Sequence, residues 1–174
     1  ERFGGQLYGL TPPAMVPAIR LAPGRVYQTL HQYNDRLMAK SIQKGLQELG
    51  YEDFIFFNSF NPLYLTELPA GFRPRLFLYQ SRDNLRALEP YLRKHGPAAE
   101  LRAIRNADFS FATARQLQKD LSDLSGEEVR FLPNAASFES FRTAYEQSLP
   151  RPEELTGIPG PIIGYTGNIC HRTN

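Results

Sequence analysis

The chain has 174 residues, of which 41% are hydrophobic and 12% aromatic, enough for one domain of roughly 100 to 200 residues with a sizeable core. The net charge is only +2, which lacks the basic excess typical of a general nucleic-acid binder. A single cysteine, Cys170, excludes a disulfide scaffold and a cysteine-based zinc cluster, and favours a reducing compartment such as the cytoplasm. No apolar run approaches the roughly 20 residues that cross a bilayer.

Both ends of the sequence are typical of a fragment. The chain begins at Glu1 without an initiator methionine, in a stretch rich in proline and glycine. Its last apolar run, Ile162 to Tyr165, lies close to the final residue, Asn174. A strand placed there has little sequence after it to cover its second face. We therefore expect a piece of a longer protein.

Apolar periodicity predicts three helices. The first spans Leu30 to Leu49, where apolar residues recur mostly at helical spacing, and Gly50 follows as a stop. The second spans Pro97 to Asn106, because proline is favoured at the first position of a helix. The third spans Ala114 to Leu124, with Thr113 as its N-terminal cap.

Short apolar runs that end in turn-prone residues predict five strands. They are Asp53 to Phe57, Arg75 to Tyr79, Phe109 to Ala112, Val129 to Leu132, and Ile162 to Tyr165. Strands that alternate with helices imply right-handed crossovers and a mostly parallel sheet. The predicted fold is therefore α/β and Rossmann-like, with helices on both faces of the sheet.

The proline- and glycine-rich stretch near residues 147–161 favours a linker over a regular element. This gives an N-terminal domain over residues 1–149 and a linker over residues 150–160. Residues 161–174 are then the first strand of a second, truncated domain.

Ligands of open α/β sheets bind outside the carboxyl ends of the strands, so the loops there are the candidate site. These loops are Asn58 to Asn61, Gln80 to Asp83, Thr113, Asn134 to Ser137, and Gly167 to Arg172. Each loop taken alone is also explained as an ordinary polar surface loop. The series along the chain is more informative than any one member.

Gly96 and Pro97 open the second predicted helix, with Glu100 behind them, and a helix N-terminus attracts anions. His95 precedes this end; it either donates to a phosphate or sugar hydroxyl or is a simple surface histidine. His31 is interpreted as a surface residue of the first helix.

Residues 71–105 carry eight Arg or Lys against three acidic residues, a local net charge of +5. The basic residues are Arg73, Arg75, Arg82, Arg86, Arg93, Lys94, Arg102 and Arg105. This segment either holds a diphosphate, approaches an anionic lipid surface or is a solvated face.

The motifs of several common enzyme classes are missing from the sequence. No dinucleotide-binding G-x-G-x-x-G follows a strand, and there is no phosphate-binding P-loop, no G-x-S-x-G nucleophile elbow and no histidine spacing typical of a metal site. The sequence therefore does not favour a self-contained hydrolase or kinase.

An ordered series of motifs resembles one family of enzymes. The series is His95-Gly96-Pro97 with Glu100, Arg105 to Thr113, Phe131 to Asn134 with Phe138 to Phe141, and Ile163 to Gly167. In this order and spacing it resembles the N-terminal half of a bacterial family-four glycosyltransferase of the GT-B fold, over about residues 50–174.

The resemblance implies an acceptor-side Rossmann-like domain that lacks its opening strand and helix. The whole enzyme would move a sugar from a nucleotide-sugar donor to a glycan or lipid-linked acceptor in cell-surface polysaccharide synthesis. It would do so with retention and without metal or cofactor, in the cytoplasm or peripherally at the inner face of the membrane, with no nucleic-acid partner. The acidic pair that contacts the donor would lie outside this chain, so we expect the fragment alone to be inactive.

The resemblance also implies roles for individual residues. Gly167 and Asn168 match the glycine turn beside the donor diphosphate, and Arg172 is placed to add a charged contact. His95 matches a histidine of the family's N-terminal domain and is the candidate catalytic residue. The acceptor-side candidates are Asn58, Ser59, Asn61, Gln80, Arg82 and Asp83.

Two departures from the family pattern affect these roles. Ala135 and Ser137 stand where the family often has Gly and Asp, and the loop that begins at Gln80 replaces a more usual acidic or histidine-bearing loop. These departures leave the acceptor unpredicted. A non-catalytic α/β module for ligand binding or regulation stays open as the alternative.

Overall fold

The computed structural model describes residues 7–88, 90–147, 150–165 and 167. The chain divides into two compact units, one through Asn134 and one from Ala135 onward. The first unit carries the sheet. The second contains α4 (Phe138–Glu146) and a short 3-10 turn, η3 (Glu153–Leu155).

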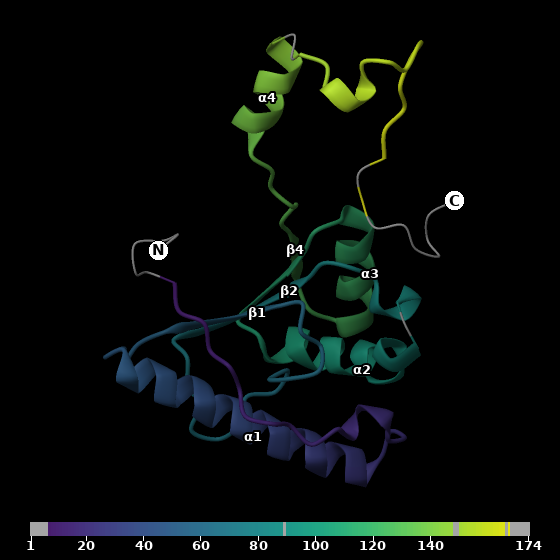
Figure 1. The fold of residues 1–174 in the computed structure, drawn as a ribbon. Coiled ribbons are helices and arrows are strands. Elements are labelled where there is room, and N and C mark those ends of the chain that lie inside the picture. The colour runs from purple at the N-terminus through teal and green to yellow at the C-terminus, as the bar shows by residue number, and fades with distance from the viewer. Residues whose placement is uncertain (1–6, 89, 148–149, 166, 168–174) are drawn as a thin grey trace. The chain divides into compact units, whose positions relative to one another are not determined.

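The first unit is built on a parallel sheet of four strands in the order in which they occur along the chain (Figure 1). The strands are β1 (Ile55–Ser59), β2 (Leu76–Ser81), β3 (Phe109–Ala112) and β4 (Val129–Phe131). All three pairings are parallel. The α/β class and the parallel sheet are thereby confirmed, with strand bounds close to those expected from the apolar runs.

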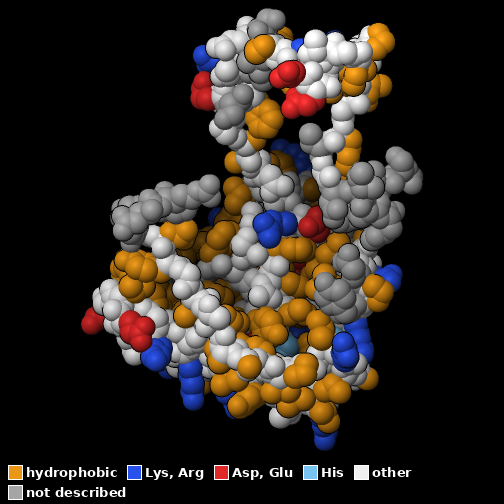
Figure 2. All heavy atoms as spheres, viewed as in Figure 1, with side chains coloured by type: hydrophobic (Ala, Val, Ile, Leu, Met, Phe, Trp, Pro, Cys, Tyr) orange, Lys and Arg blue, Asp and Glu red, His pale blue; other side chains and the backbone are white. Residues whose placement is uncertain are grey.

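Three helices accompany the sheet: α1 (Arg25–Glu48), α2 (Pro90–Asn106) and α3 (Arg115–Ser125). Two single-turn 3-10 helices, η1 (Ala18–Arg20) and η2 (Leu85–Ala87), precede α1 and α2. α3 ends at Gly126, whose φ of 75° is the left-handed conformation that glycine adopts without steric cost. Figure 2 shows hydrophobic side chains exposed over the sheet-bearing unit and Lys and Arg side chains along its lower edge, where α1 lies.

All three helices of this unit lie on one face of the sheet, not on both faces as predicted. The strand order explains this for α2 and α3, because successive right-handed crossovers that step in one direction place every connection on the same side. α1 precedes β1 and reaches the same face through the packing of Ala39 near Phe56. The opposite face is apolar and open, with Ile55 57%, Phe57 47% and Phe109 37% exposed. In register, Phe57 pairs with Leu78, and Leu78 with Phe109, so these side chains share that open face.

Two apolar clusters fill the covered face. One joins β2, β3 and β4 to α2 and α3 through Tyr79, Ala103, Ile104, Ala112, Leu117, Leu121 and Val129. The other joins β1 to α1 through Phe56, Ala39 and Phe72, with Leu65 from the β1–β2 connection. Phe56 of the second cluster also stacks on Phe77 of β2, with 5.4 Å between the ring centroids.

The second helix begins earlier than predicted. It starts at Pro90, and Pro97 lies inside it. Both prolines are compatible with a helix start, and the sequence alone does not rank them. Inside the helix Pro97 lacks the N–H that would bond to the carbonyl four residues earlier. His95 and Gly96 are therefore interior helix residues, and the predicted anion-attracting helix end at Pro97 is wrong.

Two smaller expectations also differ from the structure. Thr113 does not cap α3, whose N-cap is Ala114 without a side-chain bond. Residues 161–165 adopt no strand, because a strand requires a neighbour to accept its backbone hydrogen bonds. The sheet-bearing unit ends at Asn134, ahead of the predicted limit at residue 149, and the three-part domain division stays a prediction.

Candidate functional site

Ser59 is the last residue of β1, and Gln80 is the second-last residue of β2. The two are direct neighbours in the sheet. The Ser59 hydroxyl donates a hydrogen bond of 2.9 Å to Oε1 of Gln80. The two residues are register partners, so the pairing follows from the parallel ladder and not from a chance rotamer. The structure therefore brings two predicted acceptor-side residues together.

The loop after β1 is closed by Asn58, which is 4% exposed. Its Nδ2 donates to the carbonyls of Asn61 and Tyr64, at 3.1 and 3.2 Å, while its Oδ1 accepts from the Asn61 N–H. Asn58 is therefore occupied in shaping the loop. Phe60, in the middle of it, has a φ of 60°, a left-handed conformation that costs a bulky residue about 1–3 kcal/mol.

The loop after β2 lies against the same region. The guanidinium carbon of Arg82 lies 5.7 Å from the centre of the Phe60 ring, within range of a cation–π contact. The Thr113 hydroxyl donates to the Arg82 carbonyl at 3.0 Å, which ties this loop to the end of β3. Arg82 and Asp83 are exposed. The carboxyl ends of β1, β2 and β3 thus form one polar edge, which we call the carboxyl edge.

The predicted donor-side residues belong to the second unit. Asn168 and Arg172 lie outside the described residues. Gly167 is described, and a Cβ at this position would come within 2.7 Å of the Tyr165 hydroxyl. That hydroxyl is the far end of an exposed side chain, which can move aside, so the contact does not by itself require glycine at position 167.

The buried carboxyl group of Glu100 is hydrogen-bonded to residues near the end of β2, next to the carboxyl edge. Glu100 of α2 accepts hydrogen bonds at Oε1 from the Ser81 hydroxyl, at 2.6 Å, and the Tyr79 hydroxyl, at 3.3 Å. Burial raises the pKa of Glu100, although both hydrogen bonds and the charge of Arg86 oppose that rise. Burial and the neighbouring Glu100 charge also raise the pKa of Tyr79.

His95 is buried and not presented to solvent. Its ring stacks on that of Tyr27 with centroids 3.7 Å apart, and its Nε2–H donates to the carbonyl of Leu21 at 3.0 Å. Burial lowers the pKa of His95, which favours the neutral ring. These contacts join α2 to α1 and to the segment after η1. A catalytic role for His95 stays a prediction, and its surroundings here are those of a packed side chain.

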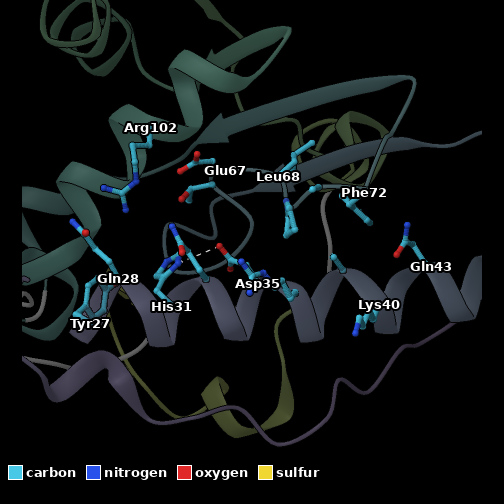
Figure 3. A pocket seen from close by; sticks show the side chains of 16 residues that line it. Tyr27, Gln28, His31, Asp35, Lys40, Gln43, Glu67, Leu68, Phe72 and Arg102 are labelled. Carbon is cyan, nitrogen blue, oxygen red and sulfur yellow. Dashed lines mark ion pairs between the residues drawn. The ribbon is translucent and has the colours of Figure 1, made fainter. Parts of the chain in front are cut away.

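A hollow of about 560 Å³ lies on the helix side of the sheet, between α1, residues 66–72 and Arg102 of α2. We call it the α1–α2 hollow (Figure 3). Its volume falls in the range of about 300–1,000 Å³ that is typical of small-molecule sites. No residue of the carboxyl edge lines it.

His31 and Asp35 form an ion pair in the wall of this hollow, with Nδ1 3.1 Å from Oδ2. The other carboxylate oxygen of Asp35 accepts from the backbone N–H of Leu65 at 2.9 Å. The surface position expected for His31 is therefore wrong, since its side chain is 11% exposed. Tyr27, His31 and Asp35 recur at four-residue steps, and this polar stripe on one helix face is the signal that the sequence offered.

The described residues also bear on metals and membranes. Within the described ranges, no three His, Cys, Asp or Glu side chains lie close enough together to hold a metal ion. No helix among them combines the length and apolar character needed to cross a bilayer.

Comparison with known proteins identifies no relative, because no family model, curated protein or solved structure matches the chain.

Proposed function

We propose that the chain is the acceptor-side domain of a retaining glycosyltransferase of the GT-B type. The enzyme would move a sugar from a nucleotide-sugar donor to a glycan or lipid-linked acceptor in the synthesis of cell-surface polysaccharide. The proposal rests on the ordered motif series in the sequence together with one structural observation: polar side chains gather at the carboxyl ends of three adjacent parallel strands.

The carboxyl edge has the chemistry that sugar recognition requires. Ser59 and Gln80 supply a hydroxyl and an amide, and Arg82 and Asp83 supply a donor and an acceptor of opposite charge. Hydroxyl groups of a sugar both donate and accept, so a mixed edge of this kind matches them better than a uniformly charged one. Phe60 adds a ring beside Arg82, against which the apolar face of a sugar can pack.

The test uses the protein expressed from the complete open reading frame, assayed for nucleotide release from UDP-, GDP- and dTDP-sugars with and without candidate acceptors. Acceptor-dependent release is the expected result. Arg82→Gln should then raise KM for the acceptor with little change in KM for the donor, because the carboxyl edge contacts the acceptor. Arg93→Gln, an exposed arginine of α2 outside the edge, is the matched control.

The absence of release from every donor, or an effect of Arg82→Gln on donor KM alone, would contradict this assignment. The second candidate is a non-catalytic α/β module for ligand binding or regulation. The α1–α2 hollow favours it, since this preformed concave surface lies apart from the carboxyl edge where transfer would occur.

A further inference from the structure

Arg102 is a half-buried arginine of α2 that points from this helix toward the side chains of α1 (Figure 3). Its guanidinium forms no hydrogen bond or ion pair with any other described residue. A guanidinium offers five N–H donors in a planar fork that matches phosphate and carboxylate oxygens. A partly desolvated arginine without such a partner is poised to receive one from outside the chain.

Tyr27 places a second unused donor beside Arg102. Its ring is 7% exposed and held by the stack on His95, yet its hydroxyl has no hydrogen bond to a described residue. The Arg102 charge lies close enough to lower the pKa of Tyr27, against the stronger rise caused by burial. The phenol and the guanidinium both line the α1–α2 hollow.

The other side chains that line the hollow determine which charge and polarity a ligand must have. Arg36 and Lys40 add two cations, so three cationic side chains line the hollow against the carboxylates of Asp35 and Glu67. Asp35 is already engaged by His31 and by the Leu65 N–H. The balance favours an anion, while the amide of Gln28 and the carboxylate of Glu67 suit hydroxyl groups.

The walls of the hollow are held in place without a ligand. Gln43 of α1 donates to the carbonyl of Gly71 at 2.8 Å, and Asp35 accepts from the Leu65 N–H, so α1 is bonded to the β1–β2 connection at two points. A site that is already formed requires little ordering on binding, which preserves affinity.

We propose that the α1–α2 hollow binds a small hydroxylated phosphomonoester, with its phosphate on Arg102 and the Tyr27 hydroxyl and its hydroxyl groups on Gln28 and Glu67. This site is separate from the carboxyl edge. The inference does not rest on the proposed transferase activity and applies equally to a binding module.

In the experiment, glucose 6-phosphate, glucuronate, glucose and inorganic phosphate are each titrated into the 174-residue chain. Binding is measured by calorimetry and by the shifts of amide NMR signals. Saturable binding of glucose 6-phosphate is expected, tighter than that of the other three probes, with shifts in residues 28–40 and 66–72. Arg102→Gln should weaken it roughly ten- to hundredfold, the loss expected for a hydrogen-bonded charge. Tyr27→Phe, which retains the ring stacked on His95, should weaken it by a smaller factor.

Arg93→Gln provides the control, because Arg93 is an exposed arginine of the same helix that does not line the hollow. Equal losses in Arg93→Gln and Arg102→Gln would overturn the proposal, as would the absence of saturable binding at millimolar concentrations. Tighter binding of glucuronate would overturn the phosphate assignment. Shifts confined to residues 58–61 and 80–83 would place the ligand at the carboxyl edge instead.

A final arm tests a lipid source of the phosphate. The chain is sedimented with vesicles of phosphatidylcholine that contain phosphatidic acid, a lipid phosphomonoester. No sedimentation is expected, because the hollow is a pocket between helices of limited volume. Sedimentation that Arg102→Gln abolishes, without any response to glucose 6-phosphate, would overturn the assignment to a soluble ligand.

Discussion

The hydroxyl of Ser81 and the carboxylate of Glu100 are joined by a hydrogen bond of 2.6 Å beneath the end of β2. Only one carboxylate oxygen is used, since Oε1 also accepts from Tyr79 whereas Oε2 is buried with no partner among the described residues. A buried carboxylate oxygen without a partner is costly when the group is charged. The stability of the sheet unit should therefore depend on the protonation of Glu100.

Glu100→Gln tests this dependence. Because the folded-state pKa of Glu100 is raised, the stability it contributes is complete below the unfolded pKa of about 4.3 and is lost as the pH rises toward the folded value. The neutral glutamine does not titrate. The unfolding free energy of the wild type should therefore fall relative to that of Glu100→Gln as the pH is raised. Urea unfolding at a series of pH values measures the difference.

Glu127→Gln serves as its control, because Glu127 is exposed. It removes one carboxylate as Glu100→Gln does, so the comparison separates the effect of the buried position from that of losing a charge. A flat difference for Glu100→Gln over the same pH range would show that the buried carboxyl has the same proton affinity in the folded and unfolded chain.

Asp35→Ala should destabilise the chain by about 1–3 kcal/mol, because it leaves the N–H of Leu65 buried without an acceptor. Leu65 has a φ of 52°, so this bond also holds a strained backbone position. Asp35→Asn retains an acceptor oxygen and loses only the charge that faces His31, so its cost should be smaller. Unfolding free energies and the hydrogen-exchange rate of the Leu65 amide are the measurements; equal costs for the two variants would assign the effect to the ion pair.

His95→Gln should reduce stability near neutral pH by about 0.5–1.5 kcal/mol, the value of an aromatic stack, while an amide N–H replaces the donor to Leu21. Its second effect concerns pH. The pKa of His95 is lowered in the folded state, so the stability it contributes is complete above the unfolded pKa of about 6.5 and is lost on acidification. Thermal unfolding between mildly acidic and neutral pH should show a shallower loss for His95→Gln, and an unchanged slope would refute this.

Phe57→Ala and Phe77→Ala compare the two faces of the sheet with one substitution. Phe77 is 2% exposed and packs on Phe56, so its truncation should cost about 3–5 kcal/mol. Phe57 is 47% exposed on the open face and should cost much less. Urea midpoints measure both costs, and similar values would indicate that the open face is covered in solution.

The strands were predictable because each is a short apolar run with polar residues after it. Which face of the sheet the helices cover was not predictable. Runs such as Asp53 to Phe57 and Arg75 to Tyr79 are apolar at successive positions and do not alternate between apolar and polar residues. The start of α2 was missed because Pro90 and Pro97 offer the same local signal. In the structure Pro97 lies inside the helix, and the neighbouring His95 packs on Tyr27, a tertiary contact that the local sequence does not indicate.

One part of the candidate site was predictable from the sequence, and another part was not. The carboxyl edge follows from the parallel sheet, so Ser59, Gln80 and Arg82 could be grouped from the order of strands and loops. The α1–α2 hollow could not be predicted, because it depends on the distance between two helices whose facing residues are far apart in sequence. The repeat of Tyr27, His31 and Asp35 indicated one face of α1 without indicating what faces it.

The order of the strands also bears on how the chain assembles during synthesis. Each strand pairs with the strand that precedes it in sequence, so β1 and β2 can pair before β3 leaves the ribosome, and every later strand extends the same growing edge. No strand has to be inserted between two that have already paired. Each closure spans a single connection, so the order of translation is also a permissible order of folding.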